Sequence, residues 1–370
     1  MDVARLRKNF AEVAAHGDEV PLFFYSDLFI KHPELREMFP ISMAAQRGHL
    51  IDALAKIVSY VDRADELSVF LEGLGRDHRK FGVAGEHYAA VGESLLATLE
   101  FFAGEGWTAE LAGDWQAAFA VVAGVMRRAA ATDEAVNPAF WRGVVTSSER
   151  RAFDVAVLQV RPEPTLGFVP GQSVAVCSPR RPRLWRYYSI ANAPREDGSL
   201  ELHVRLVDGG AVSPVLTDGQ VVGEELRLGP ATGVLVLDGS ERDILMVGGS
   251  TGLAPLKALC EHVAGMGGGR HVQLFFCART ADELYDLPAM EKMAAEHPWL
   301  TVTPAVTADP RFAGERGPVA EVVARGGDWT GRDAYLAGPS EMVHAVAGRR
   351  AEAGMPRERV HVEDFGWSEP

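Results

Sequence analysis

Apolar side chains in the first 130 residues recur at intervals of three and four, which is the spacing of one helix face. Four stripes show it: Leu50, Leu54, Ile57, Val58 and Val61; Leu71, Leu74 and Phe81; Tyr88, Val91, Leu95 and Phe102; Trp115, Phe119, Val122 and Met126. The pattern predicts an all-α domain over residues 1–132. The polar stretch from Ala131 to Pro138 predicts a linker after it.

The period changes after this stretch. Two segments alternate apolar with polar or small residues: Phe153, Val155 and Val157, and less cleanly Leu202, Val204 and Leu206. Turn signals separate the segments: Pro170-Gly171, Asp208-Gly209-Gly210 and Gly229-Pro230. This pattern is typical of an antiparallel β-barrel, which we expect over residues 138–238.

From about Asp243, short apolar strands alternate with helical intervals. The candidate strands are Ile244–Val247, Gln273–Cys277, Leu300–Val306, Ala334–Leu336 and Val360–Val362. This rhythm predicts an α/β domain with a parallel sheet over residues 241–370. The predicted fold class is therefore multidomain: all-α, then an antiparallel β-barrel, then parallel α/β.

Composition narrows the possible partners. The net charge of −14 over 370 residues, without a local basic run, argues against nucleic acid or an anionic membrane. The longest strongly apolar stretch, near Ala117 to Met126, is too short to span a bilayer, and the N-terminus does not resemble a signal peptide. Cys177, Cys260 and Cys277 lack metal spacing and read as buried thiols. We expect a cytoplasmic protein, a monomer or weak dimer, acting on small molecules.

Candidate chemistry begins with two motifs, Arg186-Tyr187-Tyr188-Ser189 and Gly248-Gly249-Ser250-Thr251-Gly252-Leu253-Ala254-Pro255. Tyr188 can lie along a flavin ring while Arg186 and Ser189 meet ribityl and phosphate oxygens. The glycines let backbone N–H groups approach a second pyrophosphate at a helix N-terminus. Taken singly, each motif also has a purely structural interpretation. The first fits a half-buried strand, and the second fits a tight strand–helix turn that binds nothing.

Between the two motifs lies Gly209-Gly210-Ala211-Val212-Ser213, and the order of all three closely resembles the ferredoxin–NADP reductase superfamily. The resemblance covers roughly residues 140–370. It implies FAD and NADH or NADPH as cofactors. It also implies a helix under the flavin pyrophosphate that is opened by Gly210, Val212 and Ser213.

The resemblance continues to the C-terminus. It implies that Gly338 and Pro339 border the nicotinamide, with Ala337 in place of the family's cysteine. Glu363 to Trp367 resembles the closing segment of the family. This implies that Glu363 lies at the flavin and that Phe365 covers the ring until nicotinamide displaces it.

Arg279, just past the predicted strand Gln273–Cys277, is the candidate contact for a 2′-phosphate, or else it faces water. Because no second basic residue adjoins it, the sequence favours NADH over NADPH.

Four polar groups lie on apolar faces of the helical domain: Tyr25, Gln46, His78 and Tyr88. A lone histidine on such a face is more often a hydrogen-bonded core residue than a ligand. Buried polar groups nevertheless need partners. A heme b would supply them, since an imidazole can bind the iron from one side while hydroxyl and amide groups serve O₂ on the other.

The helical domain resembles the globin domain of flavohemoglobins, so the resemblance covers nearly the whole chain. The matching segments are Phe24 to Phe29, Lys31 to Phe39, Gln46-Arg47, Lys80-Phe81, Glu86 to Tyr88 and Val91 to Leu99. The match implies that His78 is the proximal iron ligand and that Phe39 packs against the porphyrin. It implies that Tyr25, Gln46 and Leu50 line the distal side and that Tyr88 orients the proximal histidine.

Two positions depart from that family. Counting from Trp115, Ala130 stands where flavohemoglobins place a glutamate beside the proximal histidine. Asp77 stands where well-known members carry lysine. A carboxylate near the imidazole strengthens electron donation from the imidazole to iron. Loss of the carboxylate therefore weakens electron donation to bound oxygen.

The resemblance implies an oxidoreductase that passes electrons from NAD(P)H through FAD to heme, as a nitric oxide dioxygenase producing nitrate. FAD is interposed because nicotinamide delivers two electrons and heme iron accepts one at a time. Two alternatives stay open: a flavin reductase serving O₂, peroxide or a partner protein, and an oxygen- or redox-sensing globin.

Overall fold

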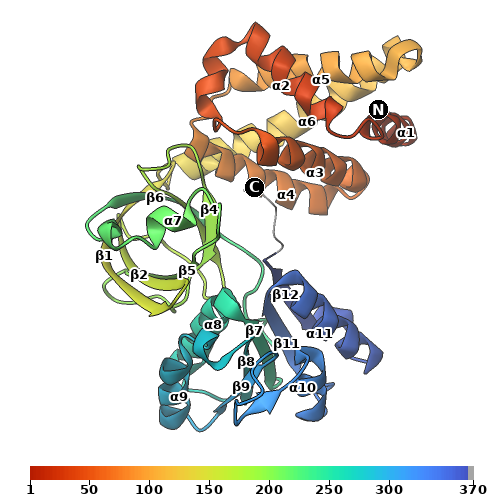
Figure 1. Cartoon of the computed structure of the whole chain (residues 1–370). Helices are drawn as coiled ribbons and strands as arrows, with labels where there is room; N and C mark the ends of the chain where they lie inside the picture. Colours follow the sequence, from red (N-terminus) through yellow and green to blue (C-terminus); the bar gives the residue numbers. More distant parts are fainter. Residues whose placement is uncertain (366–370) are drawn as a thin grey trace. The chain divides into compact units, whose positions relative to one another are not determined.

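The computed structural model describes residues 1–365, which form two compact units divided between Phe140 and Trp141 (Figure 1). The first unit is helical and runs from red to yellow in the figure. The second contains two six-stranded sheets.

The first unit confirms the predicted all-α domain. Its helices are α1 (Val3–Ala14), α2 (Glu19–Lys31), α3 (Ala44–Tyr60), α4 (Ala64–His78), α5 (His87–Ala103) and α6 (Ala109–Glu134). Short 3₁₀ turns lie at η1 (Pro33–Met38), η2 (Arg79–Phe81) and η3 (Gly104–Gly106). The side chain of Asp2 caps α1 and that of Thr108 caps α6, as expected of helix-initiating residues.

The prediction of a linker from Ala131 was wrong for its first four residues, because α6 continues to Glu134. Asp133 is buried and forms an ion pair with Arg79, the residue that follows His78. Arg79 also donates to the carbonyl oxygens of Asn137 (2.9 Å) and Pro138 (3.3 Å). These tertiary contacts keep a polar segment helical that composition alone assigns to a loop.

The first sheet of the second unit is the predicted antiparallel barrel. Its strands are β1 (Trp141–Ala152), β2 (Val155–Glu163), β3 (Ser173–Cys177), β4 (Arg186–Ser189), β5 (Leu200–Arg205) and β6 (Glu225–Thr232). They are ordered β4-β3-β6-β1-β2-β5, and a bridge from Ile190 to Leu202 joins the two ends of the sheet. Short turns at α7 (Ser213–Leu216) and η4 (Gly219–Val221) follow β5.

Phe153 is not the strand residue that its alternation suggested. It lies in the turn between β1 and β2 and is 90% exposed. Strand β2 is buried on both faces: Leu158 packs inside the barrel, and Val155 and Val157 pack with the core of the second sheet. Burial on both faces explains the unbroken apolar run from Val155 to Leu158.

The second sheet is the predicted parallel α/β sheet. Its strands are β7 (Ile244–Gly249), β8 (Val272–Ala278), β9 (Leu300–Val306), β10 (Glu315–Arg316), β11 (Asp333–Gly338) and β12 (Val360–Asp364). The strand order is β10-β9-β8-β7-β11-β12. Successive connections run toward one edge of the sheet up to β10 and toward the other edge from β11, so the switch lies between the parallel strands β7 and β11, and ligands are expected at the carboxyl ends of those two strands.

Helices cover both faces of this sheet. One face packs against α8 (Leu253–Gly265) and α9 (Leu287–Glu296), and the other against α10 (Val319–Arg325) and α11 (Ser340–Glu352). The 3₁₀ turns are η5 (Ser250–Gly252), η6 (Ala281–Glu283) and η7 (Arg357–Arg359). Within residues 1–365, no helix is long and apolar enough to cross a membrane.

Helix α4, which ends at His78, crosses α6 closely at Gly75. A Cβ at Gly75 would lie 2.4 Å from the Met126 carbonyl oxygen, whereas one at Gly73 would meet nothing within 4 Å. We expect Gly75→Ala to destabilise the protein by about 1–3 kcal/mol through overpacking. Gly73→Ala, the matched control, should be neutral or stabilise by about 0.5–1 kcal/mol. Urea unfolding of the full chain followed by helical circular dichroism checks this; equal effects of the two substitutions would contradict the close crossing.

Candidate functional site

His78 is the last residue of α4 and has one ring nitrogen engaged. Its Nδ1 lies 2.8 Å from the Leu74 carbonyl oxygen, which fixes the proton on Nδ1 and leaves Nε2 as an acceptor. Burial lowers the pKa of His78, and the Leu74 carbonyl opposes this only partly. A neutral imidazole held through Nδ1 is the form that ligates a metal, so the residue fits an iron ligand.

Three of the residues predicted to surround the heme come together on one apolar cluster. Tyr25 (α2), Phe39 and Leu50 (α3) belong to it, with the Tyr25 and Phe39 rings 5.5 Å apart. The Tyr25 hydroxyl donates a long hydrogen bond of 3.4 Å to the Gln46 main-chain oxygen. Burial raises the pKa of Tyr25 to about 12, so its hydroxyl stays protonated and remains a donor. This arrangement suits stabilisation of a partly negative ligand.

Tyr88 lies on a separate cluster, packed beside Leu71 and Met126. Burial raises the pKa of Tyr88 against the opposing charge of Arg127. Asp77, which precedes His78, is already paired with Lys80 at 2.5 Å, and Arg79, which follows His78, is paired with Asp133 of α6. The position of Ala130 on α6 carries no carboxylate.

Strand β4 presents the Arg186–Ser189 motif. Tyr188 is half-buried opposite Val174 of β3, Arg186 and Tyr187 are exposed, and Ser189 is buried. An exposed guanidinium beside a half-buried ring provides both a phosphate contact and a surface for an aromatic cofactor.

The predicted helix at Ser213 is α7, with buried Val212 as its N-cap. Ser213 Oγ accepts the Val207 N–H at 3.0 Å. A Cβ at Gly210 would lie 2.9 Å from the Val207 carbonyl oxygen, so this turn requires glycine. The structure thus confirms the helix start; its relation to a flavin pyrophosphate stays a prediction.

The glycine turn packs against the end of β11 at the point where strand order reverses. A Cβ at Gly252 would lie 2.1 Å from the Ala337 carbonyl oxygen, and one at Gly338 would lie 2.8 Å from the Gly249 oxygen. Gly248 and Gly249 end β7, and Ser250, Thr251 and Gly252 form η5. The predicted nicotinamide residues Gly338 and Pro339 therefore lie directly beside the turn.

Sequence reasoning missed Arg205, which ends β5. Its Nη1 donates to Ser250 Oγ at 2.8 Å, and its Nε donates to Asp154 at 2.7 Å. Ser250 has a φ of +54°, a conformation that costs a non-glycine residue energy. The hydrogen bond from Arg205 holds this turn in place. In the sequence, an arginine at the end of a strand cannot be distinguished from an ordinary surface arginine.

Glu363 on β12 joins strand β4 to the second sheet. Ser189 Oγ donates to its Oε1 at 3.1 Å, while Oε2 is buried with no partner among residues 1–365. Burial raises the pKa of Glu363 to about 7, opposed by the Ser189 hydrogen bond. An orphaned carboxyl oxygen beside Ser189 fits a contact to a bound cofactor.

Phe365 follows β12, and its N–H donates to the Gly338 oxygen at 2.9 Å. The structure thus brings Phe365 to the predicted nicotinamide position. Gly366 and Trp367, the rest of the predicted closing segment, lie outside the described residues.

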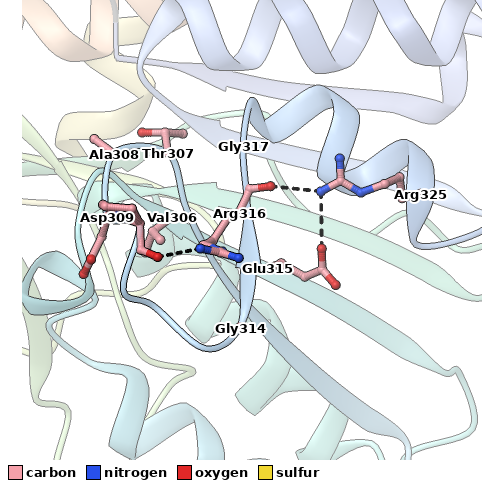
Figure 2. A pocket seen from close by; sticks show the side chains of 10 residues that line it. Val306, Thr307, Ala308, Asp309, Gly314, Glu315, Arg316, Gly317 and Arg325 are labelled. Atoms are coloured by element: carbon pink, nitrogen blue, oxygen red, sulfur yellow. Dashed lines mark hydrogen bonds and ion pairs between the residues drawn. The ribbon is translucent and has the colours of Figure 1, made fainter.

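Arg279 lies at the carboxyl end of β8 and is paired with Glu283, whose Oε1 is 2.8 Å from Arg279 Nη2. The Arg279 carbonyl accepts the Ala308 N–H at 2.7 Å, which ties it to the rim of an open pocket of about 600 Å³. Figure 2 shows Arg316 and Arg325 lining this pocket, with Arg325 donating to Glu315 and to the Arg316 carbonyl. The pocket lies at the ends of β9 and β10, next along the sheet from Arg279.

Three family models match the chain in this order. A globin model covers residues 22–126, an oxidoreductase FAD-binding domain covers 143–235, and an oxidoreductase NAD-binding domain covers 246–348. The fold and these matches thus define a globin joined to an oxidoreductase with FAD- and NAD-binding domains.

Some relatives align over nearly the whole length of this chain. The flavohemoprotein of Bordetella pertussis is 29% identical, with 95% of this chain and 94% of that protein aligned. The crystal structure of the Malassezia yamatoensis flavohemoglobin with bound FAD and heme shares the fold at 18% identity, with a TM-score of 0.81 and 98% of each chain covered. The chain belongs to the flavohemoglobin family, and it is an NAD(P)H-dependent oxidoreductase with heme and FAD as cofactors.

The reductase half has other relatives as well. The xylene/toluene monooxygenase electron transfer component of Pseudomonas putida is 31% identical, covering 63% of this chain and 67% of that protein.

The raised pKa of Glu363 predicts a pH effect on stability. Its carboxyl holds its proton up to about pH 7 in the folded chain but only to about 4.5 when unfolded. The folded state therefore binds more protons between these values, so the group's contribution to stability falls as pH rises from 4.5 through 7. Relative to Glu363→Gln, the FAD-free wild type should lose about 3 kcal/mol over this range.

Urea unfolding of both proteins at pH 4.5 and pH 8 measures the difference. Glu358→Gln, an exposed change in η7, is the control and should leave the pH dependence unchanged. Parallel pH profiles for wild type and Glu363→Gln would show that the carboxyl is not buried as described.

Proposed function

We propose that this flavohemoglobin is a nitric oxide dioxygenase, which converts NO and O₂ to nitrate with electrons from NADH. Bound heme supplies the iron at which oxygen and NO react, and bound FAD divides the electron pair from nicotinamide into single electrons. The observation that carries the proposal is the buried, protonated Tyr25 hydroxyl beside Gln46. Such a donor stabilises the negative charge that develops on activated oxygen.

In the globin unit, His78 is the proposed iron ligand, with its Nδ1 proton held by Leu74. Phe39 and Leu50 are proposed to contact the porphyrin on the apolar cluster that contains Tyr25. Tyr88 is proposed to support the proximal side through packing at the α4–α6 crossing.

In the reductase unit, Arg186, Tyr187, Tyr188 and Ser189 are proposed to bind FAD, with Gly210, Val212 and Ser213 beneath its pyrophosphate. Residues Gly248 to Gly252 and Gly338-Pro339 are proposed to bind the coenzyme. Phe365 would cover the flavin before nicotinamide arrives, and Glu363 would contact it through the free Oε2. The adjacency of Ser189, Glu363 and Gly338 supports this assignment.

A direct test follows NO, NADH and nitrate together in aerobic solution. The proposal expects NO loss and nitrate gain in equal amounts, with NADH consumed at half that amount because each NADH delivers two electrons. NADH oxidation that proceeds at the same rate without NO and forms no nitrate would refute it.

Tyr25→Phe separates the globin chemistry from the reductase. Removing one hydrogen-bond donor to developing charge should slow NO-dependent nitrate formation by about 10²-fold. Reduction of ferricyanide by NADH, which needs only the flavin, should stay at the wild-type rate. Leu22→Ala, an exposed change on the same helix, is the control. A wild-type rate of nitrate formation in Tyr25→Phe would remove Tyr25 from the proposed chemistry.

A second candidate function is a flavin reductase that delivers electrons to O₂, peroxide or a partner protein. It is favoured by Ala130 and by the pairing of Asp77 with Lys80, which leave the proximal histidine without the carboxylate that strengthens its donation. Rapid NADH-dependent dye reduction with slow nitrate formation would support this candidate.

We propose NADH as the preferred coenzyme, because Glu283 occupies the Arg279 guanidinium and places a carboxylate where a 2′-phosphate would approach. Glu283→Gln should lower the KM for NADPH about 3- to 5-fold, in keeping with an exposed ion pair, and leave the KM for NADH unchanged. Asp282→Asn, one residue away on η6, is the control. Steady-state ferricyanide reduction with each coenzyme measures the ratio; an unchanged NADPH KM would exclude Glu283 as a determinant.

A further inference from the structure

Lys257 is a buried lysine of α8 with no part in the site described so far. It stands four residues after Leu253, where α8 begins directly behind the glycine turn. Its ammonium contacts the Glu201 carboxylate of β5 at 2.6 Å and the Glu261 carboxylate at 3.2 Å. It also lies 3.5 Å from the carbonyl oxygen of Ala191, two residues past the flavin motif. The lysine therefore joins the helix behind the coenzyme turn to the chain behind the flavin strand.

Four further bonds cross between the barrel and the second sheet around Lys257. Glu261 Oε2 accepts the Ala193 N–H at 2.9 Å. His203 Nδ1 lies 2.6 Å from the Tyr285 hydroxyl, and Arg151 contacts Asp286 at 2.6 Å. Arg205 contributes the bond to Ser250 already described. The barrel and the sheet are thus held together by polar bonds, and in the Lys257–Glu201 and His203–Tyr285 pairs both residues are buried.

Glu201 is the centre of this network on the barrel side. Its Oε1 receives Lys257 and His203, and its Oε2 receives Gln159 at 2.8 Å and Arg195 at 3.1 Å. Burial alone would raise the pKa of Glu201, but His203 and Lys257 outweigh it and hold that pKa far below its usual range. The charges of Glu201 and Glu261 likewise outweigh burial and raise the pKa of Lys257. Both partners stay ionised at neutral pH.

The network resembles a metal site only in part. Glu201, His203 and Asp286 offer donor atoms within 4.8 Å of one another. The places that a cation would occupy are filled by Lys257 on Glu201 and by Arg151 on Asp286. The protein's own cations therefore balance these carboxylates.

We propose that Lys257 is a positioning residue for hydride transfer, which sets the distance between the nicotinamide-binding turn and the flavin-binding strand. The inference rests on the electron path from nicotinamide to FAD, and not on the fate of the electrons at the heme. Hydride transfer is sensitive to small displacements of the donor ring, so a shift of α8 relative to β5 affects the rate and not the cofactor content.

The test uses Lys257→Met in the full chain with FAD and heme bound. Anaerobic stopped-flow mixing with NADH should show the limiting rate of flavin reduction reduced by about 10- to 100-fold. The long-wavelength absorption of nicotinamide stacked on the flavin should weaken. FAD content and flavin reduction by dithionite should match wild type. Lys292→Met, which removes an exposed lysine from α9, should change none of these readings.

Tyr285→Phe is the milder second variant, since it removes only the hydroxyl that crosses to His203. We expect a smaller decrease, about 3- to 10-fold, in the same limiting rate. Hydrogen exchange of the FAD-free variants should rise in residues 190–205 and 253–261, which is a readout independent of turnover.

The outcomes separate the two proposals. If NADH does not reduce the flavin of the wild-type protein, the proposed electron path from nicotinamide to FAD is overturned. A wild-type limiting rate and unchanged stacking band in both variants, with only a lower melting temperature, would overturn the positioning role of Lys257 alone.

Discussion

The ion pair between Lys257 and Glu201 is the contact on which the geometry of the reductase unit depends. Both groups are nearly buried, and removing one partner of such a pair typically costs about 3–5 kcal/mol because the other charge is left without compensation. In the intact pair the loss of hydration is offset, because each oxygen of Glu201 and the ammonium of Lys257 have several partners. Polar groups have directional requirements that apolar packing lacks. The pair therefore fixes one relative placement of the barrel and the sheet, whereas an apolar interface would tolerate several.

Close main-chain approach supplies the second constraint. The glycine turn after β7 and the end of β11 touch through Gly252, Ala337 and Gly338, with no room for a side chain. Glycine at these positions is explained by packing before any ligand is considered. The same contact leaves the N-terminus of α8 beside Gly338, and Phe365 is tied to this place through its N–H. Packing thus requires glycine at residues that are also proposed to bind the coenzyme.

The surroundings of His78, the proposed iron ligand, differ from those that the resemblance to flavohemoglobins implies. The position on α6 expected to hold a glutamate is Ala130, and the nearby carboxylates of Asp77 and Asp133 are neutralised by Lys80 and Arg79. The remaining support for His78 is the Leu74 carbonyl within its own helix. A carbonyl is a weaker acceptor than a carboxylate, so donation from the imidazole to a bound iron is weaker as well.

The sequence by itself determined the three-part order and most elements, because helical and strand periodicity reflect local burial, and it singled out the cofactor motifs because their residue types are chemically distinctive. It misjudged Phe153 and the end of α6, where a turn and the Arg79–Asp133 pair override local composition. It could not find Arg205, Lys257 or the orphaned Oε2 of Glu363. Their meaning comes from partners between 45 and 174 residues away in the chain. Only tertiary structure brings such groups together, since hydrogen bonds and ion pairs depend on distance in space and leave no period in the sequence.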